Sequence, residues 1–381
     1  MSTATADPQV SFEVTEEQEL LRATVRDLLQ TKAGSGRVRE VMLGDDGLDL
    51  DLWAELAGLG LLGLTIPEPY GGAGATFVEV AVVAEELGRT LAPVPYLSSA
   101  VLGTVALLHG ATDDQRATHL PGVATGETRL ALAHLDERGR LTADPGVRAV
   151  PDGDGWVLDG TAGYVVDGRT ADLVVTAAVT DDGLELFLVG GDADGLDRTD
   201  VEVLDLTRPM ATLTYAGVRV AAAARLTGGD PMIALHEALS AGVVAVACEQ
   251  VGGTRAVLAS TTAYARDRVQ FGRAIGSFQA VKHRLAEMLV QVESARSAAA
   301  HAARVVASGD LQERAIAAPL AGAYCAEVYE QAAGDSIQLF GGIGFTWEHD
   351  AHLFFKRAKA TKLLLGDPKH HRALLARTLG V

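Results

Sequence analysis

The stretch Tyr264–Met288, YARDRVQFGRAIGSFQAVKHRLAEM, gives the clearest indication of what this chain is. A long apolar segment precedes it, and the pattern predicts a helix that ends at Phe271-Gly272, where glycine can adopt the left-handed conformation. Ser277 is a favourable N-cap, so a second helix is expected to begin with Phe278. This arrangement would place Arg268 near one helix end and Gln279 in the first turn of the next helix.

These two side chains suit a phosphate group. A guanidinium is planar and permanently charged, and pairs with phosphate through two hydrogen bonds. An amide beside free N–H groups at a helix N-terminus suits the rest of a nucleotide diphosphate. The residues taken alone are equally compatible with a helical hairpin that carries an arginine at an interface.

Resemblance to a known family decides between these interpretations. Arg268-x-Gln-Phe271-Gly, followed by Ile275-Gly276 and Phe278-Gln279, resembles the signature of the acyl-CoA dehydrogenases, and the run Gln338–Phe345, QLFGGIGF, resembles their second FAD-binding segment. The resemblance implies that the ADP half of FAD is bound across a subunit interface. The implied residues are Arg268, Phe271, Gln279, Gln338, Leu339, Phe340, Gly341 and Gly342.

Composition limits the classes of function. The 381 residues are 48% hydrophobic and 22% charged, which is ordinary for a soluble globular protein. The chain has 32 Lys+Arg against 50 Asp+Glu, a net charge of −18, so nucleic acid and anionic membranes are not expected partners. The sequence shows neither a signal peptide nor an uninterrupted membrane-spanning run, and we predict a cytoplasmic protein. Its two cysteines are expected in the core.

Periodicity predicts three parts. Residues 1–126 read as an N-terminal helical domain, which includes a capping box at Thr15 and Gln18 and a helix over 97–109. Residues 127–226 change to a period of two with Asp-Gly turns, which indicates a β-barrel or sandwich. Residues 227–381 return to helices, with Asp230-Pro231 and Asp367-Pro368 as helix starts. This order matches the acyl-CoA dehydrogenase fold, whose last domain is a four-helix bundle.

The catalytic base of the family is missing. The reaction implied by the resemblance is α,β-dehydrogenation of an acyl-CoA thioester to the 2-enoyl-CoA, in which a carboxylate removes the α-proton and hydride passes to the flavin. The usual glutamate position near the C-terminus holds Leu365, and the alternative position on the long helix holds Gly242. Glu249, two helical turns after Gly242, is the best replacement candidate, although an interfacial or solvent-facing glutamate is the simpler interpretation. Glu237 and Asp367 are weaker candidates.

The flavin-ring contacts are lost as well. The family's Thr-Glu-Pro-x-x-Gly-Ser-Asp run corresponds to Leu130–Arg140, LALAHLDERGR, which preserves none of it. Its Trp-Ile-Thr segment corresponds to Tyr164-Val165-Val166, without the hydroxyl that contacts the flavin. The ADP-binding motifs, by contrast, are intact.

A chain with intact ADP-binding motifs but without the base and the flavin-ring contacts resembles the non-catalytic companion subunit of heterotetrameric steroid side-chain acyl-CoA dehydrogenases. The leading hypothesis is therefore a chain that supplies the ADP-binding half of a flavin site to a homologous catalytic chain in an α2β2 assembly, with acyl-CoA as substrate and electron-transfer flavoprotein as electron acceptor. Two alternatives stay open: a self-sufficient homomeric dehydrogenase that uses Glu249, and a flavin-free structural subunit.

The remaining polar clusters carry less information. His349, His352 and His370-His371 have no accompanying carboxylate or cysteine pattern, so we predict no metal site. Lys356, Arg357, Lys359 and Lys362 form a basic group that is expected to be a solvated face, with a docking surface for an anionic partner as the alternative.

Overall fold

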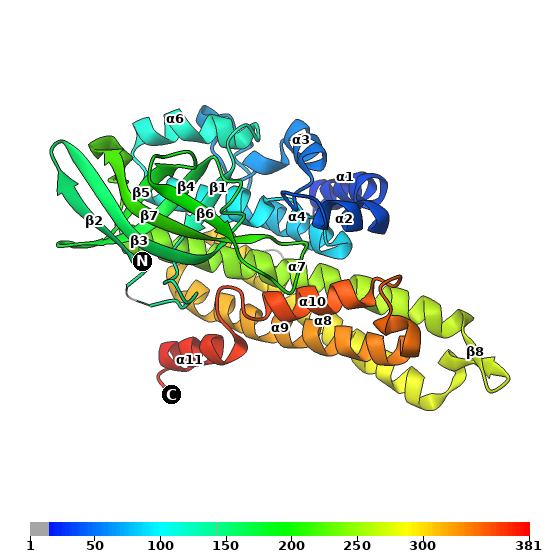
Figure 1. Ribbon diagram of the computed structural model, residues 1–381. Coiled ribbons are helices and arrows are strands. Elements are labelled where there is room, and N and C mark those ends of the chain that lie inside the picture. Colours follow the sequence, from blue (N-terminus) through cyan, green and yellow to red (C-terminus); the bar gives the residue numbers. More distant parts are fainter. Residues whose placement is uncertain (1–14, 143) are drawn as a thin grey trace, which may run out of the picture.

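The computed structural model describes residues 15–142 and 144–381. Helices form the first part, one curled β-sheet the middle, and a bundle of long helices the last part (Figure 1). The family fold predicted from the sequence is confirmed in this order of helices, sheet and helices. Elements change type between Ala124 and Leu130 and between Ala221 and Pro231, so both predicted domain boundaries fall within connections.

The N-terminal part is helical because amphipathic segments alternate with favourable N-caps. The predicted capping box of Thr15 and Gln18 is present, and Thr76 and Thr112 form two more. Its helices are α1 Glu16–Lys32, α2 Ser35–Met42, α3 Leu50–Gly58, α4 Phe77–Thr90, α5 Thr104–Gly110 and α6 Asp113–Ala124, with short 3-10 turns η1 Leu61–Gly63 and η2 Glu68–Tyr70.

The helix expected over 97–109 differs from the prediction. Residues Tyr96–Gly103 form a π-helix, η3, which continues into α5. Thr104 donates its hydroxyl to the carbonyl of Ser99, five residues back, at 2.8 Å. A Cβ on Gly103 would lie 2.4 Å from the Cβ of Leu130, so the wider turn ends where the sheet approaches the helix closely.

The middle part is a single seven-stranded curled sheet, whereas the sequence suggested a barrel or sandwich. Its main path runs β1-β4-β2-β3-β7-β6, and β5 pairs with β4. Register shifts between β3 and β7, one between Leu158 and Gly160 and one between Ala162 and Val165, bend the sheet. The strands are β1 Leu130–Ala133, β2 Val147–Asp152, β3 Gly155–Val166, β4 Leu173–Thr180, β5 Gly183–Gly190, β6 Leu196–Asp200 and β7 Met210–Ala221, followed by the turn η4 Ala222–Ala224.

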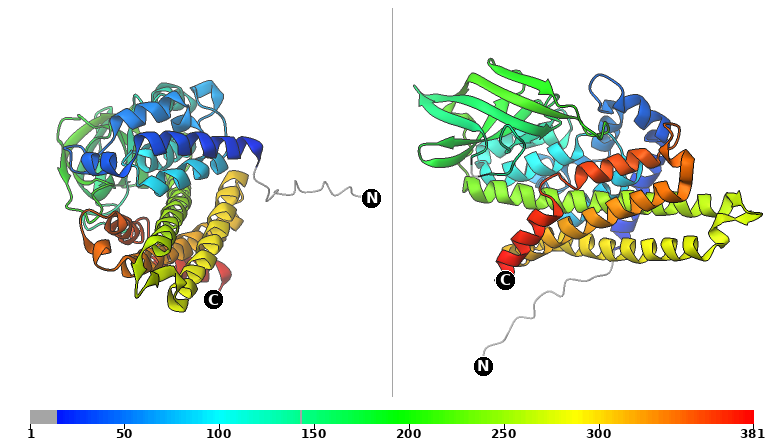
Figure 2. Two further views of the ribbon diagram at one scale, coloured as in Figure 1. Left: turned by 90° about the vertical axis from the view of Figure 1, so that its right-hand side faces the viewer. Right: turned by 60° about the horizontal axis from the view of Figure 1, so that its bottom comes forward.

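The last part is built around α7, which extends over Pro231–Asp267. Asp230 caps it as predicted, accepting from the backbone N–H of Ile233. Figure 2 shows α7, α8 and α9 running side by side, with a small hairpin projecting beyond their far end. The other elements are β8 Val269–Gln270, β9 Arg273–Ala274, η5 Ile275–Ser277, α8 Gln279–Ser308, α9 Leu311–Phe340, η6 Gly341–Phe345, α10 Ala351–Thr361 and α11 Pro368–Leu379.

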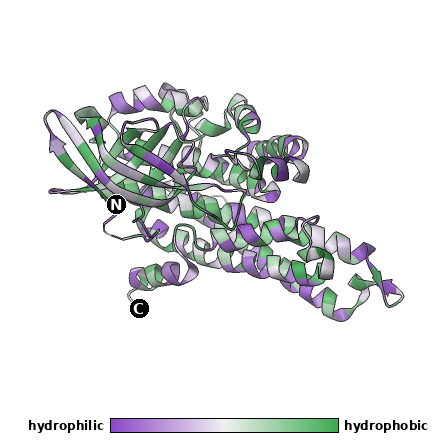
Figure 3. Cartoon of the chain, in the orientation of Figure 1, coloured by the Kyte–Doolittle hydropathy of each residue, from purple (hydrophilic) through white to green (hydrophobic). Residues whose placement is uncertain are grey.

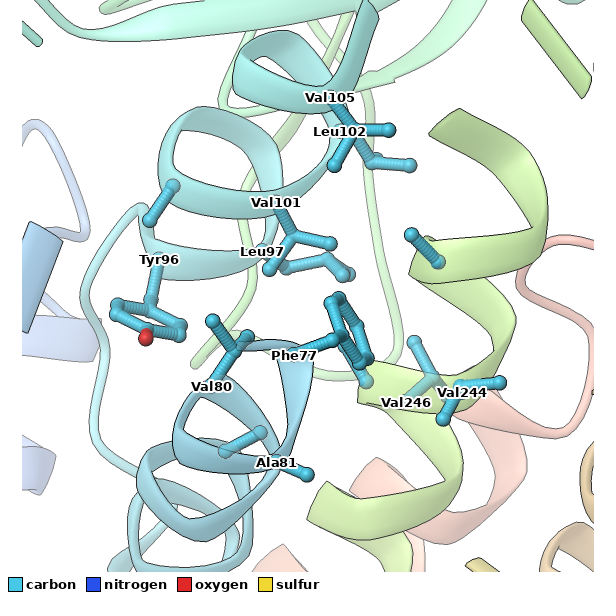
Figure 4. Close-up of a cluster of buried hydrophobic side chains, with 14 of the residues drawn as sticks. Phe77, Val80, Ala81, Tyr96, Leu97, Val101, Leu102, Val105, Val244 and Val246 are labelled. Atoms are coloured by element: carbon cyan, nitrogen blue, oxygen red, sulfur yellow. The ribbon is translucent and has the colours of Figure 1, made fainter. Parts of the chain in front are cut away.

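Helix α7 is also the central element of the core. Glycines allow close approach to α4: a Cβ on Gly252 would lie 1.8 Å from the carbonyl oxygen of Glu85. Figure 4 shows apolar side chains of α4, η3 and α7 meeting in one cluster. Figure 3 shows hydrophilic residues on the outer helices and strands and at the hairpin end.

One helix in the described part of the chain, α7, is long and apolar enough to span a membrane by length and composition. However, 67% of its most apolar stretch is buried inside the protein, as in the core helix of a folded domain.

Candidate functional site

The arginine motif forms a β-hairpin rather than a simple helical turn. Helix α7 ends at Asp267, four residues earlier than predicted, because Arg268 takes an extended conformation. Val269 pairs with Ala274 and Gln270 with Arg273. Phe271 and Gly272 form the two-residue turn with φ of 54° and 77°, as a type I′ turn requires.

The predicted N-cap is also different. Ser277 lies in the 3-10 turn η5, and its hydroxyl donates to the carbonyl of Ala274 at 2.7 Å. Helix α8 begins at Gln279, with Phe278 as an N-cap that makes no side-chain hydrogen bond. The first backbone N–H groups of α8 therefore lack a side-chain cap, and Gln279 is exposed in this first turn.

Phe271 occupies an unusual position for an aromatic residue. Its side chain is 92% exposed at the hairpin tip, and its backbone is in the left-handed region. A bulky residue in this region costs about 1–3 kcal/mol, and such strain is concentrated at functional sites. The Phe271 ring is edge-on to Phe278 at 6.2 Å between centroids. Exposure and strain together indicate that Phe271 is suited to contact a molecule outside its own subunit.

Arg268 is available to a ligand. It is exposed, and within the described residues its guanidinium makes no hydrogen bond or ion pair. Its backbone is fixed on both sides, because its N–H donates to Tyr264 and its carbonyl accepts from Ile275. The structure thus presents an uncompensated cation on a rigid support.

The second motif lies beside the first. The hydroxyl of Tyr264 donates to the carbonyl of Phe340 at 3.3 Å, and their rings are 4.8 Å apart. One turn earlier, the hydroxyls of Thr261 and Ser336 are 2.7 Å apart. The end of α7 is therefore joined to the end of α9, and both predicted ADP-binding motifs lie at the same end of the bundle.

The residues of the second motif divide into anchors and an open loop. Phe340 is buried and Leu339 half-buried, whereas Gln338 is exposed. A Cβ at Gly341 or Gly342 would meet no atom within 4 Å, and Gly341 has φ of 66°. An open glycine backbone beside a free guanidinium fits the diphosphate and ribose of a dinucleotide. These residues therefore fit the ADP half of FAD.

The two positions at which the motif resemblance would place the base face each other. A Cβ added to Gly242 would lie 2.9 Å from Cδ1 of Leu365 and 2.5 Å from Cδ2 of Leu102. Leu365 has φ of 61°, a strained conformation that directs this leucine toward α7. The space in front of Gly242 is thus filled by two isobutyl groups that cannot accept a proton.

Glu249 is buried in an ion-pair network. Arg208 donates to one carboxylate oxygen at 2.5 Å, and Arg357 donates to the other. Arg357 also pairs with Asp205 and donates to Thr207. Burial acts to raise the pKa of Glu249, but Arg208 and Arg357 outweigh it and hold the pKa below its usual range. Glu249 is thus neither interfacial nor solvent-facing, and an engaged, anionic carboxylate of this kind is poorly placed to act as a general base.

A cavity of about 20 Å³, room for a single water molecule, adjoins this network. It lies between Tyr96 and Leu97 of η3 and Ala245 of α7. The space between η3 and α7 is therefore almost completely packed.

The residues that correspond to flavin-ring contacts line a larger cavity. Tyr164 of β3 and Leu135 face Leu363–Leu365 across about 810 Å³ between the sheet and the last helices. Tyr164 sits at a bulge of β3 with φ of 53°, and Val166 is buried and carries no hydroxyl. Val166, at the position of the threonine in the motif resemblance, therefore offers no hydroxyl to a flavin ring.

The two half-sites of one chain are far apart. Gly242 and Arg268 are 26 positions apart on α7, which at 1.5 Å per residue corresponds to about 39 Å. Figure 1 shows the sheet over one half of α7 and the hairpin at the opposite end. This distance exceeds the length of an extended dinucleotide, so one dinucleotide could not reach both Arg268 and the space in front of Gly242.

Comparisons with known proteins show the family to which this chain belongs. Residues 15–127 match the acyl-CoA dehydrogenase N-terminal domain, and residues 232–380 match the acyl-CoA dehydrogenase C-terminal domain. The acyl-CoA dehydrogenase IpdE2 of Mycobacterium tuberculosis is 36% identical over 93% of this chain and 94% of its own length. The chain belongs to the acyl-CoA dehydrogenase family. Members of this family are FAD-dependent oxidoreductases.

Solved structures of the family give the same result. A chain of the ChsE4-ChsE5 complex from Mycobacterium tuberculosis matches with a TM-score of 0.89 and 31% identity, over 97% of this chain and 99% of that one. A variant of the Tcur3481-Tcur3483 steroid ACAD matches with a TM-score of 0.87 and 34% identity, over 96% and 98%. The resemblance to steroid acyl-CoA dehydrogenases predicted from the sequence is confirmed.

The weaker candidates have structural roles in this acyl-CoA dehydrogenase. Glu237 pairs with buried Arg314, and Asp367 caps α11 by accepting from the N–H of His370 at 2.7 Å. His352 stacks on Trp347, and Nδ1 of His349 accepts from the N–H of Ala351. Within the described residues, no group of three or more His, Cys, Asp or Glu side chains is arranged to hold a metal ion.

The prediction of a solvated basic face was wrong for Arg357, which is only 2% exposed. Lys359 and Lys362 both pair with Glu330 on α9. Sequence reasoning also missed Leu102 as the residue that fills the base position and Asp205 as the partner of Arg357. Periodicity assigns Arg357 to a helix but carries no signal for an acidic partner from a distant loop.

Proposed function

We propose that this chain is the companion subunit of a heteromeric acyl-CoA dehydrogenase and supplies the ADP-binding half of a flavin site to a homologous catalytic chain. The observation that carries the proposal is the contrast between the two ends of α7. At one end the hairpin offers a free Arg268 and an exposed Phe271. At the other end, the base position is filled by Leu365 and Leu102.

Each residue of the hairpin end has a proposed task. Arg268 pairs with the diphosphate, and Gln279 with the uncapped N–H groups of α8 binds its remaining oxygens. Phe271 packs against the cofactor at the subunit boundary, and Gln338 with the glycine backbone of Gly341 and Gly342 contacts the ribose. FAD would supply the acceptor for hydride, while the catalytic chain would supply the base and the acyl pocket.

The assembly that fits is an α2β2 heterotetramer acting on an acyl-CoA, with electron-transfer flavoprotein as the electron acceptor. A homologous catalytic partner is supported by the similarity to a chain of the ChsE4-ChsE5 complex. The 39 Å estimate between Gly242 and Arg268 supports a site shared between chains over a site completed within one chain.

The test is Arg268→Ala in the complex of this chain with its catalytic homologue. The flavin affinity of the complex, measured by titration followed through visible absorbance, should fall at least about tenfold, because a buried charge-assisted pair contributes about 1.5–3 kcal/mol. Arg377→Ala, at an exposed position on α11, is the matched control and should leave flavin affinity unchanged.

Unchanged flavin affinity in Arg268→Ala would contradict the proposal and favour a flavin-free structural subunit. Yellow protein from this chain alone that is bleached by an acyl-CoA would instead favour a self-sufficient dehydrogenase. Glu249, the base considered for that alternative, gains no support from its ion pairs with Arg208 and Arg357.

A further inference from the structure

A small cavity lies where the N-terminal helices meet the bundle of long helices. Its volume is about 70 Å³, which is room for more than one water molecule. Side chains of α1, α4, α7 and α8 line it. No residue of the hairpin, of the Gln338–Gly342 segment or of the base position is among them, so a ligand site in this cavity is independent of the proposed function.

The polar groups of this cavity are mainly basic. Much of the wall is made of small apolar side chains, such as Val82 of α4 and Ala303 of α8. The charged side chains that line it are Arg22, Glu85, Arg296 and Arg304. Three guanidiniums against one carboxylate make the cavity locally positive, within a chain of net charge −18.

The one carboxylate in the lining is already engaged by other helices. Arg22 of α1 pairs with one oxygen of Glu85 at 2.8 Å, and Arg255 of α7 donates to the other. Burial acts to raise the pKa of Glu85, but Arg22 and Arg255 outweigh it and hold that pKa below its usual range. Glu85 is therefore a charged group whose two oxygens are both used at α1 and α7.

The arginines of α8 are set out along one face of the helix. Arg296 and Arg304 are eight residues apart, and Ala300 lies between them, four residues from each. Arg296 pairs with Glu293 of its own helix at 3.7 Å, and both side chains are well exposed, so this pair is weak. No acidic side chain stands at position 300, where it would compensate both arginines.

Positive charge extends beyond the cavity. The buried carboxylate of Glu86 is paired with three arginines, Arg22, Arg26 and Arg89. Burial is the largest cause that lowers the pKa of Arg89. The positive charges of Arg26 and Arg255 lower it further, although Glu86 acts in the opposite direction. Arginines at this junction therefore repel one another, and a bound anion would reduce this repulsion.

We propose that the cavity binds one small oxyanion, which pairs with Arg296 and Arg304 and lies in the positive field of Arg22. Guanidinium groups bind carboxylate, sulfate and phosphate oxygens through paired hydrogen bonds. Sites for drug-sized ligands have volumes of about 300 Å³ or more, so a cavity of about 70 Å³ takes an inorganic ion or a short carboxylate but no nucleotide. The anion would join the N-terminal helices to the bundle.

The experiment is thermal unfolding of the full-length chain at constant ionic strength, with phosphate, sulfate or acetate replacing chloride. At least one oxyanion should raise the melting temperature in a saturable way at millimolar concentration. Arg296→Gln should weaken its apparent affinity about three- to tenfold, because one charge-assisted, partly exposed pair is lost. Arg284→Gln is the matched control, since Arg284 is also a partly exposed arginine of α8 with one ion pair, and it should respond like the parent.

A second variant supplies the missing charge from the chain itself. In Ala300→Glu a carboxylate stands four residues from both Arg296 and Arg304, so the melting temperature should no longer depend on the oxyanion. Saturation by phosphate or sulfate would identify an inorganic ion, and saturation by acetate alone a carboxylate.

Three results would overturn the proposal. One is a rise in melting temperature that does not saturate, because excluded salts stabilise any folded protein in this way. Another is an equal response of Arg296→Gln and Arg284→Gln. The third is an Ala300→Glu variant that folds and still responds to the oxyanion like the parent. If Ala300→Glu does not fold, the comparison of the two arginine variants still decides the question.

Discussion

The side chain of Leu365 stands directly in front of Gly242, with Cδ1 2.9 Å from the place of a Cβ on that glycine. The two residues occupy the two positions from which acyl-CoA dehydrogenases, by the motif resemblance, present their base. Leu365 therefore occupies the space that a side chain at position 242 would need, and this space is open to Leu365 because position 242 is glycine. A larger side chain at either of the two positions requires a smaller one at the other.

We predict that Gly242→Ala destabilises the protein by about 1–3 kcal/mol, because the new methyl group overlaps Leu102 and Leu365. Combining it with Leu365→Ala should recover part of this loss, with a coupling energy of about 0.5–3 kcal/mol in a double-mutant cycle. Urea unfolding of the parent, the two single variants and the double variant measures this coupling energy. Strict additivity would show that the two side chains do not compete for this space.

Glu249→Gln separates a structural from a catalytic role. Removing the charge leaves Arg357 and Arg208 partly uncompensated in the core, which should cost about 3–5 kcal/mol of unfolding free energy. The kcat of folded, flavin-loaded complex should change less than about threefold, since no proton transfer depends on this residue. A kcat loss of about a thousandfold with an unchanged melting temperature would instead identify Glu249 as the base.

Phe271→Asn tests the hairpin tip. Asparagine tolerates the left-handed backbone that Phe271 adopts, so the turn should persist, with stability equal to or above that of the parent. The exposed ring is lost, and flavin affinity of the assembled complex should fall about tenfold or more. Thermal unfolding of the isolated chain and flavin titration of the complex together give the result. A large drop in melting temperature with unchanged flavin affinity would assign Phe271 a role within its own fold.

Buried His134 predicts a pH dependence. Burial lowers its pKa from 6.5 to about 4, although its hydrogen bond to the carbonyl of Leu132 acts in the opposite direction. The folded state therefore resists the proton that the unfolded chain accepts. Stability is full above about pH 6.5 and falls by about 3 kcal/mol as the pH drops toward 4.

His134→Asn keeps an N–H donor near Leu132 without a titrating group. Its melting temperature should lie below that of the parent at pH 7, and the gap should narrow toward about pH 4.5. Asp167, whose pKa burial raises to about 6, acts with the opposite sign in both proteins and cancels in the comparison. A gap that is constant with pH would show that His134 does not contribute to acid destabilisation.

Much of the architecture could be predicted from local patterns. Capping residues such as Thr15, Asp230 and Asp367 fix helix starts through hydrogen bonds within three residues, and the structure contains all three. The change of the hydrophobic period to two residues shows which part of the chain forms the sheet. The curl of the sheet could not be predicted, because it depends on bulges in β3 that are set by pairing with the distant β7.

The site was predictable as motifs but not as geometry. The motif residues identified the hairpin end, yet glycine at 272 suits a helix end and a type I′ turn equally, so the end of α7 was placed four residues too late. Arg357 looked like a surface residue because its partners, Asp205 and Glu249, are far from it in sequence. The filling of the base position by Leu102 depends on the path of η3, which a regular helix would not reproduce.

Helix α7 joins the packed core at one end to the hairpin at the other. Its length therefore sets both the distance of the hairpin from the core and the direction in which the hairpin points around the helix axis. Each residue in an α-helix adds 1.5 Å and about 100° of rotation. One residue inserted between Gly242 and Arg268 would turn the hairpin through more than a quarter of a circle. An insertion of three or four residues would bring the hairpin back close to its original direction, one helical turn further from the core. Length variation in this helix should therefore be tolerated only in steps that preserve helical phase, because the hydrogen bonds that join Thr261 and Tyr264 to the end of α9 depend on that phase.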